Sequence, residues 1–317
     1  MSDRYDLLLV IGRFQPFCDA HRHAIASVAS LADRVRVVVV GDDMPRSARY
    51  PFTMTERLAI IRAEGFDAVA VPEVLTAGER MAQLEGLSDG RLTALFVFDG
   101  DYRDVSVSKL YPVPDIEVAS DAIRTAWLEG QAFGEVSDTT RGIMADVAAD
   151  PAFPALREEH AYIRQYKQEW AAAPYPPVMV TVDTFIRHDG KVLLVKRGGL
   201  PGRGQWALPG GFLDQDETLF EAALRELHEE TGLRLTPEEG RTYLTGQRVF
   251  DQPQRSARGR TITHAFAFDL SGLDLPELIA GDDAAAAKWT GIDCARNMRK
   301  HMFEDHYLIL DYFLNKA

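Results

Sequence analysis

The stretch that decides the interpretation of this chain runs from Gly211 to Leu233 and reads GFLDQDETLFEAALRELHEETGL. Its glutamates Glu226, Glu229 and Glu230 are spaced i, i+3 and i+4, so in a helix their carboxylates emerge on one face. Carboxylates at this spacing repel one another, and a divalent cation that prefers oxygen ligands, Mg²⁺ or Mn²⁺, removes the repulsion. For the carboxylates alone, an ordinary solvated acidic helix is the alternative.

The apolar residues of the same stretch predict how this helix packs. Four of them repeat at i, i+3, i+4 and i+7, which places them on one face against a core: Phe220, Ala223, Leu224 and Leu227. Thr218 is suited to be the N-cap, and Gly232 stands where the left-handed end of a helix favours glycine. We therefore expect a helix between these two residues.

As a whole, the stretch resembles the signature of the Nudix hydrolases at every defined position: Gly, five residues, Glu, seven residues, Arg-Glu-Leu, one residue, Glu-Glu, one residue, Gly-Leu. The resemblance implies that Glu226 and Glu230 are metal ligands, and that Glu229 is a third ligand or orients the attacking water. It also implies that Arg225 orients a neighbouring glutamate and that the carbonyl oxygen of Gly210 adds a ligand. Mg²⁺ or Mn²⁺ would then assist the attack of water on a diphosphate.

The general base is not identified by these residues. Glu229 is one candidate, and Asp282 and Asp283, in the loop before residues 284–289, are two others. His264 lies in a strand-like alternating pattern, which favours packing over catalysis.

Length and composition describe two soluble domains rather than a membrane or secreted protein. The 317 residues are 46% hydrophobic and 26% charged, and no run of about 18 apolar residues occurs. The beginning of the chain does not resemble a signal peptide, and two cysteines, Cys18 and Cys294, imply no disulfide framework, so we expect a cytoplasmic protein. The net charge of −13 argues against a nucleic-acid partner but allows a local basic pocket for a phosphorylated ligand.

The first half of the chain alternates between apolar strand patterns and helical patterns. Strands are expected at 5–12, 33–40, 67–71 and 94–98, and helices at 19–32, 54–64, 78–86 and 120–129. Residues 148–170 are helical in tendency, although Pro151 and Pro154 interrupt the start of this segment. This order predicts an α/β doubly wound, Rossmann-like domain with a parallel sheet. Its first loop then lies at the carboxyl edge of the sheet, beside a helix N-terminus, where phosphates bind.

A linker, AAAPYPP at 171–177, separates this half from a strand-rich half, so we place the domains at 1–172 and 173–317. The second half is expected to hold a mixed sheet between helices, as in the α/β/α sandwich of the Nudix family. The strands are expected at 178–188, 191–197, 206–212, 241–250 and 261–270, and a final helix at about 294–315.

The first loop resembles the nucleotidylyltransferase superfamily, and most closely the nicotinamide mononucleotide (NMN) adenylyltransferases. The matching segments are GRFQPFCDAH at 12–21 and PFTMTER at 51–57. The resemblance implies nucleotide contacts from Gly12, Arg13 and Phe14, and a catalytic contact from the surviving motif histidine, His21.

This motif departs from the family pattern at several phosphate-contacting positions. Cys18 replaces the first histidine of His-x-Gly-His, and Ala20 replaces its glycine. The later family motif keeps Arg124 as a nucleotide-binding residue, but Asp121 adds a like charge beside the phosphates, and Asp101 aligns loosely with a basic or polar contact. These departures predict weakened or absent adenylyl transfer.

Two arginine-containing loops flank the Nudix signature and predict how an anionic substrate is bound. Arg197 precedes a glycine-rich segment, and Arg255, Arg258 and Arg260 follow the signature. Trp206 and Phe250 would suit adenine stacking, although core packing is the stronger interpretation of each.

Taken over its whole length, the chain resembles the bifunctional NMN adenylyltransferase/Nudix hydrolases of bacteria, whose Nudix half cleaves ADP-ribose to AMP and ribose 5-phosphate. That resemblance implies ADP-ribose as substrate, with NMN and ATP as further ligands if both domains are active. The alternatives are a Nudix hydrolase of another nucleoside diphosphate derivative and a nucleotide-sensing regulator without turnover. A homo-oligomer is left open.

Overall fold

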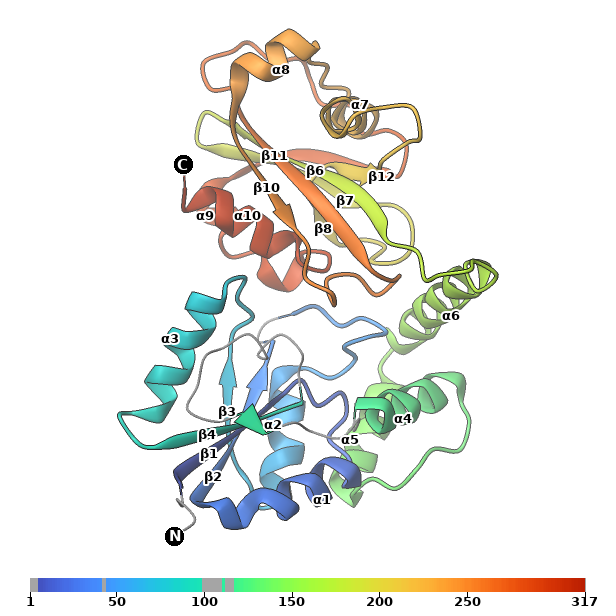
Figure 1. Ribbon diagram of the computed structural model, residues 1–317. Helices are drawn as coiled ribbons and strands as arrows, with labels where there is room; N and C mark the ends of the chain where they lie inside the picture. Colours follow the sequence, from blue (N-terminus) through green and yellow to red (C-terminus); the bar gives the residue numbers. More distant parts are fainter. Residues whose placement is uncertain (1–4, 42–43, 99–109, 112–116, 317) are drawn as a thin grey trace. The chain divides into compact units, whose positions relative to one another are not determined.

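The structure is a computed structural model that describes residues 5–41, 44–98, 110–111 and 117–316 (Figure 1). It divides into two compact units, Met1–His160 and Ala161–Ala317. The division falls inside one helix, α6 (Phe153–Glu169), ahead of the expected linker. The domain boundary at 172/173 stays a prediction.

The first unit has a five-stranded parallel sheet in the order β3-β2-β1-β4-β5. Its strands are β1 (Tyr5–Gly12), β2 (Ala32–Val40), β3 (Asp67–Val71), β4 (Thr93–Val97) and β5 (Leu110–Tyr111). Because the sheet is buried on both faces, β1 reads as a continuous apolar run, Leu7–Ile11. This confirms the doubly wound, Rossmann-like class.

Helices cover both faces of this sheet. On one face, α1 (Asp19–Val28) and α2 (Met54–Ala63) pack their buried isoleucines, Ile25 and Ile60, against β1 and β2. On the other face, α3 (Ala77–Ser88) packs Leu84 against the same strands. The unit continues with α4 (Glu117–Glu129) and α5 (Asp138–Ala149) before α6.

One helix prediction in this unit was wrong in its bounds. The first helix ends at Val28, because Ala29–Leu31 tightens into a 3₁₀ turn and β2 begins at Ala32. The segment expected at 148–170, with a start interrupted by prolines, is confirmed as helical, in two helices that part near Asp150, where Pro151 interrupts the pattern. The earlier of them, α5, was not predicted, and Ser137 caps it by accepting a hydrogen bond from the Thr140 N–H at 3.2 Å.

The second unit is built on a mixed sheet in the order β10-β11-β6-β7-β12, with two short strands attached to it. The long strands are β6 (Met179–His188), β7 (Lys191–Arg197), β10 (Leu244–Phe250), β11 (Thr261–Asp269) and β12 (Ala284–Gly291). The short ones are β8 (Trp206–Ala207), which pairs with β7, and β9 (Gly210–Phe212), which pairs with β6. β6 and β11 run parallel, and the other pairs are antiparallel.

Helices lie on both faces of the mixed sheet, which confirms the α/β/α sandwich. On one face, α7 (Leu219–Thr231) packs Ala223 and Leu227 against β6 and β11. On the other, α10 (His306–Leu314) stacks Phe313 on Phe185 of β6, with ring centroids 5.5 Å apart. Short helices complete the unit: α8 (Pro237–Tyr243), α9 (Ile292–Ala295) and a 3₁₀ helix at Arg299–His301.

Three element predictions in this unit were wrong. The strand expected at 206–212 is interrupted at Leu208 and Pro209, since proline lacks the N–H that a continuing ladder needs. The strand expected at 241–250 begins only at Leu244, after the helix that Thr236 caps. The final helix is broken into pieces, and Glu304, with a φ of 40°, lies at the last break.

Among the described residues, no helix is long and apolar enough to cross a membrane.

Candidate active site

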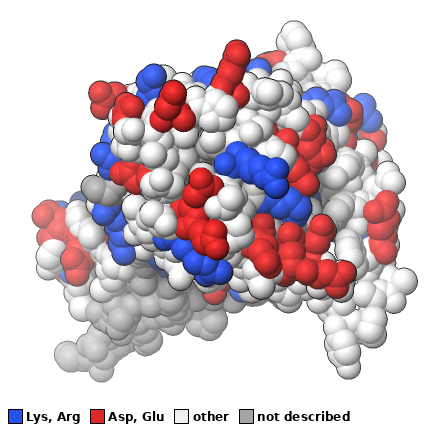
Figure 2. Space-filling view, turned by 90° about the horizontal axis from the view of Figure 1, so that it is seen from above, with Lys and Arg blue, Asp and Glu red and all other residues white. Residues whose placement is uncertain are grey.

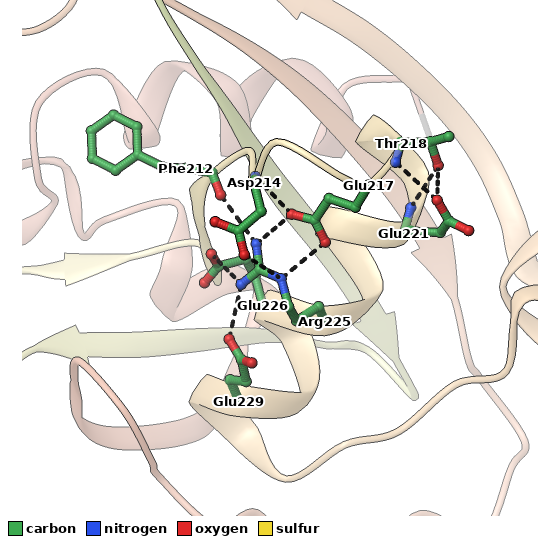
Figure 3. A network of polar contacts seen from close by, with 8 residues as sticks. All are labelled: Phe212, Asp214, Glu217, Thr218, Glu221, Arg225, Glu226 and Glu229. Carbon is green, nitrogen blue, oxygen red and sulfur yellow. Dashed lines mark hydrogen bonds and ion pairs between the residues drawn. The ribbon is translucent and has the colours of Figure 1, made fainter.

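The helix of the glutamate stretch, α7, has both predicted caps. The Thr218 hydroxyl accepts a hydrogen bond from the Glu221 N–H at 3.3 Å, and the Glu221 carboxylate accepts one from the Thr218 N–H at 2.8 Å (Figure 3). Gly232 ends the helix with a φ of 71°, and its N–H donates to the carbonyl of His228. These caps fix the helix start and end, and thereby the direction in which each glutamate points.

Arg225 is the centre of a carboxylate network on α7 (Figure 3). Its guanidinium donates twice to Glu217, at 2.6 and 3.0 Å, and once each to Glu226 and Glu229, at 2.9 Å. It also donates to the carbonyl of Phe212 at 3.1 Å, which ties β9 to the helix. The hydrogen bonds that Arg225 donates to these carboxylates, Glu217 first, raise the pKa of Arg225. One cation therefore holds three glutamates and the neighbouring strand together.

Glu226 and Glu230 are buried beside the two glycines of β9. The Glu230 carboxylate accepts a hydrogen bond from the Gly210 N–H at 2.9 Å. Gly211 faces Glu226 so closely that an added Cβ would stand 2.5 Å from its Cδ. Burial raises the pKa of Glu230 to about 8, and burial also raises the pKa of Glu226 against the effect of Arg225. Glu229, in contrast, is 41% exposed.

This donor set fits a divalent cation in its chemistry. Two carboxylates that are held in low-dielectric surroundings next to each other carry a charge that a hard cation would neutralise. Within the described ranges, no three His, Cys, Asp or Glu side chains form a ready-made metal cluster. Arg225 binds the carboxylates of Glu226 and Glu229 in this arrangement. The metal-ligand roles of Glu226, Glu229, Glu230 and Gly210 stay predictions.

The arginines predicted to bind substrate fall into two groups. Arg197 lies over the ring of Phe303, 4.3 Å from its centroid, and donates to the carbonyl of Pro201. Arg258 lies over Phe212, 4.9 Å from its centroid, and its buried Nε has no hydrogen-bond partner among the described residues. Burial and then the Arg258 charge lower the pKa of Arg197. These two cations lie near each other, where an anion would relieve their repulsion.

Arg255 and Arg260 are engaged within the protein. Arg255 is 5% exposed and donates to both carboxylate oxygens of Asp305, at 2.8 and 2.9 Å. Although burial opposes it, the charges of Asp305 and Asp183 raise the pKa of Arg255. Arg260 donates to the carbonyl of Asp251. The predicted contacts of Arg255 and Arg260 with substrate stay predictions. The buried ion pair of Arg255 with Asp305 argues against a substrate contact by Arg255.

The candidates for the general base lie on α7 and in the loop before β12. Glu229 is on α7 itself, and the charge of Asp282 contributes to the raised pKa of Glu226. The carbonyl of Asp283 accepts a hydrogen bond from the Gly198 N–H at 2.8 Å, which joins its loop to that of Arg197. His264 stacks on Phe266 with centroids 4.5 Å apart and pairs with Gln247.

Sequence reasoning missed a buried polar cluster beneath this site. Asp183 of β6 accepts a hydrogen bond from the Thr263 hydroxyl at 2.6 Å, and His306 lies 3.7 Å from its other oxygen. Burial raises the pKa of Asp183 and lowers that of His306 to about 3. An aspartate inside the apolar strand pattern VMVTVDTFI was the available signal.

In the first unit, His21 is buried in an aromatic cage. Its ring lies 4.9 Å from that of Phe98, 5.2 Å from Phe14 and 5.4 Å from Phe17. Nδ1 of His21 accepts a hydrogen bond from the Cys18 N–H at 3.1 Å, which caps α1. Burial lowers the pKa of His21 to about 3, so the ring is neutral at pH 7. The predicted contact of His21 with phosphate stays a prediction. The burial of the ring and its lack of charge both argue against this contact.

The other residues predicted to bind nucleotide in this unit hold the first loop. Arg13 forms a two-pronged ion pair with the Glu73 carboxylate. Phe14 is buried with a φ of 51°, and Gly12 leaves room for its ring. Arg124 donates to the carbonyl of Gln15 at 2.9 Å and to Asp121 at 2.7 Å, so Asp121 pairs with this arginine. Asp101 lies outside the described residues.

Charged side chains of both signs occur on the face drawn in Figure 2. Acidic and basic groups gather there in separate small patches rather than in a uniform acidic surface. Local basic sites thus exist despite the net charge of −13.

Comparisons with known proteins agree with the geometry of both units. Residues 177–313 match the model of the NUDIX domain, and residues 9–77 match that of the cytidylyltransferase-like family. Over 133 residues the chain is 41% identical to the ADP-ribose pyrophosphatase of Methanocaldococcus jannaschii, covering 42% of this chain and 72% of that one. The chain belongs to the Nudix family.

This Nudix protein also matches a solved structure over almost its whole length. The bifunctional NMN adenylyltransferase/ADP ribose pyrophosphatase of Francisella tularensis, complexed with AMP and a Mn ion, is 29% identical, with a TM-score of 0.82. The match covers 98% of this chain and 99% of that one. The chain is therefore a homologue of Nudix ADP-ribose pyrophosphatases fused to a cytidylyltransferase-like domain.

A regulator is among the relatives as well. The ADPR responsive transcriptional repressor NtrR of Acinetobacter baylyi is 33% identical over 111 residues, which are 33% of this chain and 40% of the repressor. Divalent metal ions are the cofactors of Nudix hydrolases generally, and the Francisella structure contains manganese.

Proposed function

We propose that this protein hydrolyses the pyrophosphate of ADP-ribose to AMP and ribose 5-phosphate, with Mg²⁺ or Mn²⁺ as cofactor. The observation that carries the proposal is the pair of buried carboxylates, Glu226 and Glu230, beside the backbone of Gly210 and Gly211. Burial raises the pKa of Glu230 to about 8, so its charged form is unfavourable beside Glu226, and a bound divalent cation would stabilise that charged form.

In this proposal, the Glu226 and Glu230 carboxylates and the carbonyl oxygen of Gly210 would hold the metal. The bound ion would neutralise charge on the pyrophosphate and lower the pKa of a water molecule. Water adds to one phosphorus and the bridging P–O bond breaks, so one water is consumed for each AMP and ribose 5-phosphate formed.

The side chains around the metal position have separate tasks. Arg225 holds Glu226 and Glu229 in orientation through its two bonds of 2.9 Å. Glu229 is exposed enough to meet a water molecule and is the proposed water-orienting group. Arg197 and Arg258 form the proposed anion site, because Arg258 keeps an unsatisfied Nε for a phosphate oxygen.

The test is hydrolysis by the full chain. With Mg²⁺ or Mn²⁺, ADP-ribose should yield AMP and ribose 5-phosphate in equal amounts, resolved by chromatography. A panel of other nucleoside diphosphate derivatives provides the comparison. Faster turnover of one of these would assign the same chemistry to another substrate, and binding of ADP-ribose without turnover would instead favour a nucleotide-sensing regulator.

The whole-length match to the Francisella protein favours a second candidate function, the synthesis of NAD from NMN and ATP. Two observations in the first unit oppose efficient adenylyl transfer: His21 is buried and neutral, and Arg13 is engaged by Glu73. We propose that this activity is slow or absent beside the hydrolase. Incubation with NMN, ATP and Mg²⁺ tests it, and rapid NAD formation would contradict it. The cytoplasmic location and a homo-oligomeric state stay predictions.

A further inference from the structure

The backbone from Trp206 to Phe212 brings Gly210 to the glutamates, and β6 holds its second half. Register pairs Asp183 with Gly210 and Thr181 with Phe212. The carbonyl of Pro209 accepts two hydrogen bonds from Thr184, one from its N–H at 2.7 Å and one from its hydroxyl at 3.1 Å. These contacts hold one part of the backbone, from Pro209 to Phe212, along β6.

The first half of the same backbone is held by the segment that leads into α10. The carbonyl of Trp206 accepts a hydrogen bond from the Phe303 N–H at 2.8 Å. Two residues later, the Leu208 N–H donates to Nδ1 of His306 at 3.1 Å. Since Nδ1 accepts this bond, it carries no proton, and His306 acts here as a buried hydrogen-bond acceptor.

Asp183 supports Gly210 from the side opposite the glutamates. An added Cβ at Gly210 would stand 2.8 Å from Oδ1 of Asp183, so this carboxylate lies directly against the glycine. Thr263 fixes Oδ2 by its bond of 2.6 Å, and the Arg255 guanidinium lies 4.0 Å from the same oxygen. Arg255 is in turn held by Asp305, the residue before His306. The cluster thus joins β6, the 251–260 loop and the start of α10.

We infer that His306 is a positioning residue that holds the peptide chain at Leu208. Together with Asp183, it sets the position of Gly210 against Glu230, and this position in turn sets the affinity of the site for a divalent metal ion. The inference rests on the proposed function only in taking a divalent cation as the ligand. Loss of the acceptor at Nδ1 would leave the buried Leu208 N–H unsatisfied and free the backbone that leads into Gly210. Removal of such outer partners of a metal site typically weakens metal binding by roughly 10- to 100-fold.

Two amide substitutions at His306 test whether the position of the hydrogen-bond acceptor matters, rather than only the polarity or size of the side chain. In His306→Asn, the side-chain oxygen takes the place of Nδ1, whereas in His306→Gln it extends one methylene group further. Mn²⁺ binding to the full chain, without nucleotide, is measured by the electron paramagnetic resonance signal of free Mn²⁺. We expect His306→Asn to bind Mn²⁺ within about threefold of the wild-type affinity, and His306→Gln to bind roughly 10- to 100-fold more weakly.

The control is Phe313→Leu, on the same helix, which removes a ring that packs on Phe185 of β6 and makes no hydrogen bond to the Trp206–Phe212 backbone among the described contacts. We expect it to lower the unfolding temperature without a change in Mn²⁺ affinity. Equal Mn²⁺ affinities of the Asn and Gln variants would overturn the inference, and so would an equal loss in Phe313→Leu. Because nucleotide is absent, failure to hydrolyse ADP-ribose would refute the proposed function separately.

Discussion

In a Gly211→Ala variant, the added methyl group would collide with the Glu226 carboxylate. The new Cβ would stand 2.5 Å from Cδ and 2.7 Å from Oε2, with Oε1 nearer still. Ordinary van der Waals contact begins at 3.4 Å, so the carboxylate has to retreat by about 1 Å. A misplacement of about 1 Å at a catalytic group lowers turnover by roughly 100-fold, and we expect a loss of that order.

The collision involves the end of a side chain, so we expect the fold to survive. The assay is the rate of AMP formation from ADP-ribose at saturating Mg²⁺, together with the unfolding temperature. Gly291→Ala is the matched control, because its Cβ would meet nothing within 4 Å, and it should retain full activity. Gly210→Ala is the opposite case, since its Cβ would strike the backbone of Val182 and should destabilise the fold. A Gly211→Ala enzyme with turnover within a few-fold of wild type would refute the placement of Glu226 in the site.

Three further predictions address the other side chains. Arg225→Ala should lower turnover, and it should lower the free energy of unfolding by about 1–2 kcal/mol, because hydrogen bonds to several carboxylates are lost from a partly exposed position. Denaturant titration measures the loss of stability, with Arg241→Ala as the control. An unchanged unfolding midpoint and an unchanged rate of hydrolysis would contradict this prediction. Because Glu229 is the proposed water-orienting group, Glu229→Gln should lower kcat by a larger factor than it weakens Mn²⁺ binding. A larger effect on Mn²⁺ binding than on kcat would instead make Glu229 a metal ligand. Burial lowers the pKa of His21 from 6.5 to about 3, so the unfolded chain binds a proton at higher pH than the native state does, and the native state loses stability as the pH falls from about 6.5 to 3. In His21→Asn, the loss of stability between pH 7 and 5 should be smaller than in the wild type. An identical pH dependence of stability in the two proteins would contradict the burial of this ring.

The glutamate helix was predictable from the sequence because everything that defines it is local. The cap at Thr218, the apolar face with Leu227 and the glycine end at Gly232 all lie within a few turns of one another. The buried parallel strands were predictable for a similar reason, since β1 is apolar on both faces.

Elements with competing local signals were harder to predict. Residues 241–243 have strand-forming character, but they complete the helix that begins at Pro237, where the box formed by Thr236 and Glu239 was an overlooked start signal. Pro209 divides what looks like one strand into two.

The cluster beneath the site could not be predicted from local patterns at all. Asp183, Arg255 and His306 lie far apart in the sequence and meet only through the sheet and the start of α10. Likewise, the sequence alone did not distinguish an accessible His21 from a buried one, because the rings around it come from both the first loop and Phe98.

The most direct test of the central claim is the release of AMP from ADP-ribose by the wild-type protein and by Glu230→Gln, at pH 7.5 with Mg²⁺ and then with Mn²⁺. The substitution keeps the size of the side chain and an acceptor for the Gly210 N–H, so the variant should fold with an unfolding temperature at or above that of the wild type. We predict steady AMP formation by the wild type and a loss of at least roughly 1000-fold in the variant, about 4 kcal/mol of transition-state stabilisation. Comparable rates in the two proteins, or no AMP from the wild type with either metal, would contradict the account.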